Sequence, residues 1–277
     1  MFRSAVAGIK PGCTGESTWE CLLELAGEQE WSVHGVAVVD ESLVVPSELV
    51  PLGAGGFRAE RDRDLLEKTR AAADASLSEF AHLCQSRGIP HSSSMIEGSL
   101  VDAMLDAQQA ADVVLLRYRS KSSDDSLNPA SPLHAALKHS VRPAIVFPTG
   151  GRTARRNMVI ACDGSPQAAR ALQLFALSGL AKGRTVHLLS IHDCFDDAQR
   201  LVEQAARFLL SHDIPAVAHP ARESGNVGAQ ILDHCQQLQA GMLAIGVYGQ
   251  SSVREFFFGS VTRHVLNRAD IPVFVSH

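Results

Sequence analysis

The chain has 277 residues, of which 45% are hydrophobic and 20% charged, and its formal net charge is −5. This composition is typical of a folded globular protein and excludes a disordered, collagen-like or coiled-coil chain. No apolar run reaches 18 residues, and the apolar stretch before Lys10 is too short for a secretory signal, so we expect a cytoplasmic protein without a membrane partner. Residues 1–150 carry a charge of −7 and residues 151–277 a charge of +2, and neither half has the basic excess of a nucleic-acid binder.

The sequence repeats itself. Residues 111–116 align with 240–245 at an offset of 129, and the same offset places Ser131 on Ser260 and residues 141–146 on 270–275. Earlier in each half, residues 33–40 match 186–193 at an offset of 153. The change of offset indicates about 24 extra residues in the first half, which we expect mainly within 41–65.

This insertion is predicted to be a loop that runs into a helix. Pro46, Pro51 and the glycine-rich stretch 53–56 break regular structure, whereas apolar residues from Leu65 to Cys84 follow helical spacing. No strand leads into the glycines as a dinucleotide fingerprint requires, so a flexible loop is favoured over a phosphate loop.

In the second half, apolar runs alternate with amphipathic stretches. We expect strands at 157–162, 185–191, 215–218, 242–246 and 272–275, and helices at 166–181, 196–212, 227–238 and 260–268. Such alternation predicts an α/β protein with two tandem, doubly wound parallel-sheet domains. The polar stretch 148–152 is the expected join, which gives domains 1–148 and 153–277.

Ligands of doubly wound sheets bind beyond the carboxyl ends of the strands, where the strand order reverses. Asp163 follows the first strand of the second half, and Gly246 and Gly249 follow the fourth. After nine intervening residues, a helix is expected to begin at Gly259 and Ser260. Its free N–H groups and positive dipole end would attract an anion. Ser260 suits an N-cap, and its hydroxyl could bond either its own helix or a phosphate.

The spacing G-x2-G-x9-G-S, between a fourth strand and a last helix, resembles the universal stress protein family in its tandem two-domain form. The resemblance implies an adenine nucleotide alpha hydrolase-like (Rossmann-like) fold and a bound ATP, AMP or ADP, with Mg²⁺ accompanying ATP. It implies that Gly246, Gly249, Gly259 and Ser260 contact ribose and phosphates, with a backbone N–H from Val261. It further implies that Asp163 contacts the nucleoside and that Ile191 flanks the adenine.

The first half departs from this pattern. Lys10 stands in place of Asp163, Arg117 in place of Gly246, Ser120 in place of Gly249 and Ala130 in place of Gly259, and only Ser131 matches. Side chains at these positions would fill the space that a triphosphate needs. We therefore expect nucleotide only in the second half, while the first half is a structural partner or holds another ligand. Lys10 and Arg117 could also bind an anion, although exposed cations explain them as well.

The resemblance implies a regulatory stress-response protein, and no catalytic set is visible. There is no lysine-bearing phosphate loop and no set of acid and arginine for phosphoryl transfer. The alternatives are a nucleotide-independent interaction protein of the same fold, in which the glycines are mere turn residues and residues 163–166 only begin a helix, or a slow ATP hydrolase.

Two further expectations concern metals and assembly. Five potential ligands, His187, His192, Asp193, Cys194 and His219, lack tight ligand spacing, and the six cysteines form no C-x-x-C pair, so we expect no metal. The resemblance also implies that the two repeats pack as a pseudo-twofold dimer through residues 144–147 and 273–275, and a homodimer of whole chains stays open.

Overall fold

The computed structural model describes residues 1–44, 55–118, 132–148, 156–247 and 259–276. It divides the chain into two compact units. The amino-terminal unit comprises Arg3–Val114 and His139–Val141, and the carboxy-terminal unit comprises Met1–Phe2, Leu115–Lys138 and Arg142–His277. The predicted join at 148–152 lies largely outside the described residues, so the domain boundaries remain a prediction.

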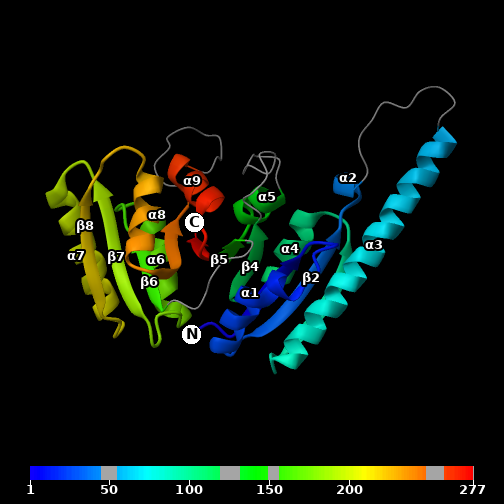
Figure 1. Cartoon of the computed structure of the whole chain (residues 1–277), viewed down its shortest axis with the longest axis horizontal. Helices are drawn as coiled ribbons and strands as arrows, with labels where there is room; N and C mark the ends of the chain where they lie inside the picture. Colours follow the sequence, from blue (N-terminus) through cyan, green and yellow to red (C-terminus); the bar gives the residue numbers. More distant parts are fainter. Residues whose placement is uncertain (45–54, 119–131, 149–155, 248–258, 277) are drawn as a thin grey trace. The chain divides into compact units, whose positions relative to one another are not determined.

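The amino-terminal unit is a parallel sheet with helices (Figure 1). Along the chain its elements are β1 (Ser4–Ile9), α1 (Glu16–Glu28), β2 (Ser32–Val39), α2 (Glu41–Val44), α3 (Gly55–Ser86), β3 (His91–Glu97), α4 (Leu100–Gln108) and the start of β4 (Val113–Tyr118). The strand order is β3-β2-β1-β4, and β1, β2 and β3 are parallel. Gly35 of β2 makes room for Phe80 of α3, because a Cβ there would lie 2.7 Å from the Phe80 ring. Phe80 in turn packs edge-on against Trp19.

The insertion is more helical than predicted. Glu41–Val44 form the short helix α2, and α3 begins at Gly55, ten residues before the expected start at Leu65. The amino-terminal turns of α3 project past the sheet in Figure 1, and there an Arg58–Asp62 pair at 3.3 Å links successive turns. Such i,i+4 ion pairs stabilise exposed helical turns that contribute no residue to the core. Because these turns lack apolar periodicity, the sequence pattern did not predict them. Residues 45–54, with Pro46 and Pro51, lie outside the described residues.

The carboxy-terminal unit has the predicted alternation of strands and helices. After the rest of β4, its elements are α5 (Pro132–Lys138), β5 (Ala144–Pro148), β6 (Asn157–Ala161), α6 (Pro166–Ser178), β7 (Thr185–His192), α7 (Phe195–Leu210), β8 (Ala216–Arg222), α8 (Val227–Gln237), β9 (Ala240–Gly246), α9 (Ser260–Arg268) and β10 (Val273–Ser276). The strand order is β4-β5-β10-β9-β6-β7-β8. The α/β, doubly wound fold expected from the sequence is therefore confirmed.

The two segments predicted to join the repeats are paired within this unit. Strand β10 runs antiparallel to β5, with Phe274 opposite Ile145, and both of these side chains are fully buried. Phe274 also packs edge-on against Phe175 of α6, with ring centroids 6.1 Å apart.

The helices that the structure describes include none with the length and apolar character of a membrane span.

A histidine on the second strand of each repeat contacts the edge strand. In β2, His34 lies 2.8 Å from the Ser92 hydroxyl and 3.0 Å from that of Ser94, through its two ring nitrogens. In β7, Nδ1 of His187 lies 2.9 Å from Nε2 of His219 on β8, and the buried Nε2 of His187 has no hydrogen-bond partner within the described ranges. Burial lowers the pKa of both His187 and His219, and for His219 the neighbouring His187 and His234 add to the effect.

We predict that this histidine pair makes stability depend on pH. Because the pKa of each imidazole is lower in the folded chain than in the unfolded chain, the unfolded chain binds more protons near neutral pH. The free energy of unfolding should therefore fall as the pH drops from about 7.5 through the unfolded pKa of about 6.5, until the folded pKa is passed. Urea titrations at several pH values measure this. The double variant His187→Leu, His219→Leu should show a shallower dependence, and an unchanged slope would refute the assignment.

Candidate functional site

The strand order of the carboxy-terminal unit reverses beside β6. From β6 the chain proceeds to β7 and β8 on one side, and β9 then pairs with β6 on the other. The crevice at a switch point of this kind is where ligands of doubly wound sheets bind. Asp163 follows β6 and Gly246 ends β9, so the structure brings these two predicted site residues to the same edge of the sheet.

The turn after β6 presents Asp163 to solvent. One carboxylate oxygen of Asp163 accepts a hydrogen bond from the backbone N–H of Ser165 at 2.9 Å, and Gly164 between them has a φ of +77°. Ser165 is buried and caps α6, since its hydroxyl accepts from the N–H of Ala168 at 3.1 Å. The second oxygen of Asp163 accepts no hydrogen bond from any described residue. It is therefore available to a hydroxyl or amino group of a ligand.

Gly246 is required by the packing of the sheet itself. A Cβ at this position would overlap the backbone N of Ala168 and lie 2.5 Å from the carbonyl carbon of Gln167, both in the first turn of α6. The next residue, Val247, is buried, and its N–H donates to the carbonyl of Ser276 at 2.8 Å. The need for glycine at 246 thus follows from a backbone contact between β9 and α6, whether or not a phosphate approaches.

Helix α9 begins without a side-chain cap. It starts at Ser260, as predicted, but Gly259 occupies the N-cap position with a φ of −55° and offers no side-chain acceptor. Ser260 is exposed and is the first helical residue, so its predicted N-cap role is wrong by one position. A Cβ added to Gly259 would meet nothing within 4 Å among the described residues. No side chain of a described residue caps the first turn, which includes the half-buried Val261 and carries the positive dipole end of the helix.

Of the two remaining predicted site residues, Ile191 and Gly249, the structure describes only the first. Ile191 lies near the end of β7, half-buried and paired with Ala221. Since Ala161 pairs with Leu189, continuing the register by two residues sets Ile191 beside Asp163. Gly249 lies outside the described residues.

The corresponding positions of the amino-terminal repeat have a different chemistry. Lys10, which aligns with Asp163, is exposed after β1, and its carbonyl accepts from the N–H of Cys13 at 3.1 Å. Arg117, which aligns with Gly246, is half-buried in β4. Ser120, Ala130 and Ser131 lie outside the described residues.

The five potential metal ligands are distributed over two places. His187 contacts His219, while Nδ1 of His192 lies 2.6 Å from Oδ1 of Asp193 and accompanies Cys194 in the exposed turn before α7. Within the described ranges, no three such side chains come close enough to share a metal ion. The expectation of no metal stays a prediction.

Sequence reasoning missed a buried polar group next to the site. Ser190 of β7 is 1% exposed, and its hydroxyl has no hydrogen-bond partner among the described residues. The sequence signal that could have identified this group is a serine within the mostly apolar run 186–191. Such a serine is expected to be buried, and a buried hydroxyl usually has a hydrogen-bond partner.

Comparison with known proteins finds similarity to the family that the sequence motif resembles. Residues 154–277 match the model of the universal stress protein family. A universal stress protein of Mycobacterium tuberculosis is 22% identical over 304 aligned positions, covering 97% of this chain and 94% of the relative, and one of Mycobacterium bovis aligns equally well. The crystal structure of a universal stress protein from Archaeoglobus fulgidus aligns with 98% of this chain and 95% of its own, with 17% identity and a TM-score of 0.73. A putative universal stress protein from Pseudomonas aeruginosa covers 99% and 92%, with 17% identity and a TM-score of 0.62.

We predict that Gly246→Ala destabilises the fold, while Gly259→Ser does not. The methyl group at 246 would force β9 away from α6, and such overpacking costs about 1–3 kcal/mol. Serine at 259 would supply the missing cap and cost nothing. Urea unfolding of both variants measures the difference. Equal stability of the Gly246→Ala variant and the parent chain would show that β9 and α6 do not approach so closely.

Proposed function

We propose that this chain, a tandem member of the universal stress protein family, binds one adenine nucleotide in its carboxy-terminal repeat and acts as a regulator of a stress response. The observation that carries the proposal is the start of α9, which no described side chain caps, in the unit whose switch point also presents Asp163. A helix start with free N–H groups is an anion site, and a phosphate is the anion that the motif resemblance implies.

Each residue has a role that suits its surroundings. The N–H groups of Ser260 and Val261, and the Ser260 hydroxyl, would donate to phosphate oxygens, while Gly259 leaves room for the phosphates. The free oxygen of Asp163 would accept from a ribose hydroxyl. Ile191, half-buried and apolar, would flank the adenine. Gly249 belongs to the proposed site on the motif alone, and Mg²⁺ would bind through the phosphates of ATP.

The amino-terminal repeat is excluded from this role in the proposal. Lys10 cannot accept a hydrogen bond from a ribose hydroxyl as a carboxylate does, because an ammonium group only donates hydrogen bonds. Arg117 places a long side chain where the other repeat has a bare backbone. We therefore propose one nucleotide per chain.

One observation favours the nucleotide-independent interaction protein as the second candidate. Since packing against α6 alone explains Gly246, this glycine is no evidence for a ligand. The two candidates are therefore distinguished at the start of α9, where the packing of the described residues does not require glycine at position 259.

We predict that Gly259→Asp abolishes nucleotide binding while the fold is kept. Aspartate is a preferred N-cap, so helix α9 should gain a few tenths of a kcal/mol. Its carboxylate would occupy the position of the phosphates and repel them, so the Kd for ATP should rise at least about tenfold, which corresponds to about 1.4 kcal/mol. Isothermal titration calorimetry on the full chain measures the Kd and the stoichiometry, for which we expect one.

Gly259→Asn is the matched control, because asparagine caps the helix without a charge. It should lose less affinity than Gly259→Asp, because its amide occupies the same space without repelling the phosphates, and it should show a similar thermal stability. ATP binding that is unchanged in Gly259→Asp, or that is absent from the parent chain, would favour the nucleotide-independent candidate. A stoichiometry of two would contradict the exclusion of the amino-terminal repeat.

We also predict that bound ATP turns over far more slowly than about 1 per second, a typical enzymatic rate. The proposed site holds phosphates with backbone N–H groups, and phosphoryl transfer requires in addition a positioned base and cations around the leaving group. Release of inorganic phosphate from the purified chain measures the rate. Turnover at or above that scale would favour the hydrolase alternative.

A further inference from the structure

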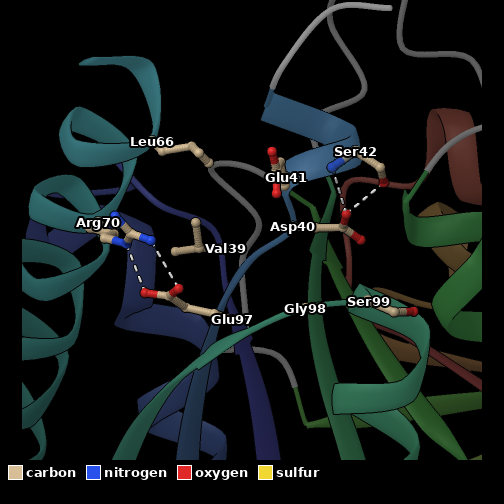
Figure 2. Close-up of a pocket in the computed structure, with 9 residues that line it drawn as sticks. All are labelled: Val39, Asp40, Glu41, Ser42, Leu66, Arg70, Glu97, Gly98 and Ser99. Carbon is tan, nitrogen blue, oxygen red and sulfur yellow. Dashed lines mark hydrogen bonds and ion pairs between the residues drawn. The ribbon is translucent and has the colours of Figure 1, made fainter. Parts of the chain in front are cut away.

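The amino-terminal unit contains a cavity of about 400 Å³ at the carboxyl ends of β2 and β3. Its lining residues come from three segments of the chain and are Val39, Asp40, Glu41, Ser42, Leu66, Arg70, Glu97, Gly98 and Ser99. Figure 2 shows Leu66 and Arg70 of α3 on one side, Asp40, Glu41 and Ser42 on the other, and Val39 between them. The volume lies within the range of about 300–1,000 Å³ that small-molecule sites occupy. Lys10 and Arg117 are not among the lining residues.

The lining is anionic. Arg70 is held by Glu97 through two hydrogen bonds of 2.7 and 2.9 Å, which raise the pKa of the guanidinium and lower the pKa of the carboxyl. Together with Asp40 and Glu41, the pair gives the described lining residues three carboxylates and one guanidinium, a formal charge of −2. An anionic ligand such as a nucleotide would be repelled here.

Asp40 is fixed in place by its neighbours. One of its oxygens accepts from the N–H of Leu100 at 2.9 Å, at the start of α4, and the other accepts from the N–H and hydroxyl of Ser42 at 3.0 and 2.5 Å. The Asp40 carboxylate thus occupies the place at the N-terminus of α4 where an anion would otherwise bind, and the Ser99 side chain caps the same helix. Glu41 is exposed and interacts with Arg70 through its charge, but it has no direct ion pair with any described residue, so its carboxylate remains accessible to a ligand.

Two classes of cation remain, and the geometry separates them. A divalent metal ion would need several carboxylates around one point, and no three acidic, histidine or cysteine side chains of the described ranges are close enough for that. The cavity is also larger than one ion requires, and Val39 and Leu66 add an aliphatic surface. An organic cation matches both properties, with its charged group beside Glu41 and Asp40 and its carbon chain against Val39 and Leu66.

We propose that this cavity binds a small organic cation, a primary amine on a short aliphatic chain. The two repeats would then bind ligands of opposite charge at the carboxyl edges of their sheets. The proposal does not depend on nucleotide binding by the other repeat, and each can fail without the other.

The test uses 1,4-diaminobutane and n-butylamine as probes and butyrate as a probe of similar chain and opposite charge. Heteronuclear NMR on the full chain should show saturable shifts for both amines at residues around the cavity, weakening as salt is added, and none for butyrate. Glu41→Gln should raise the Kd of the amines at least threefold, and Glu41→Lys should abolish their binding. Glu60→Gln, on the exposed part of α3, is the matched control and should leave the Kd unchanged.

Absence of saturable amine binding would overturn the proposal. Equal binding of butyrate, or a Kd that Glu41→Gln leaves unchanged, would also overturn it. Because Glu41 is exposed on a four-residue helix, its substitution should leave the fold intact, and thermal unfolding of each variant verifies this.

Discussion

The carboxy-terminal repeat depends on one backbone contact, the approach of Gly246 to the first turn of α6. This contact holds the end of β9 close to the start of α6, and α6 begins directly after the turn that carries Asp163. Packing therefore sets the positions of the end of β9 and of the Asp163 turn before any ligand is present. The proposed site would lose little entropy on binding, because the same packing that stabilises the sheet also positions these residues.

The motif glycines consequently have separate physical reasons. Gly246 is fixed by overlap with Gln167 and Ala168, whereas no described residue lies within 4 Å of a Cβ placed on Gly259, which has an ordinary φ. A spacing pattern in the sequence cannot separate these cases, because both positions are simply glycine. The neighbours in space show that the fold requires glycine at 246, and no described neighbour shows such a requirement at 259.

The sequence predicted the sheet of the second repeat well, because buried parallel strands leave long apolar runs and α9 starts at the residue expected. It underestimated β8, which continues past Ala218 through Pro220 to Arg222. Proline is tolerated there because β8 is an edge strand and one side of its backbone needs no partner. The nucleotide site stays a prediction from the motif, because Gly249 lies outside the described residues and packing alone explains Gly246. The cavity beside Arg70 and Glu97 could not be predicted, since these residues lie 27 positions apart on a helix and a strand.

Duplication left both repeats with the same framework and different edges. His34 and His187 occupy equivalent positions on their second strands, and each contacts the edge strand beside it. Six residues later the repeats diverge, since Asp40 is bonded to the start of α4 whereas its counterpart Asp193 is exposed and paired with His192. A carboxylate fixed at a helix start cancels the positive potential there, and an uncapped helix start keeps it. The two proposals therefore rest on the sign of the charge at each edge, more than on the shared fold.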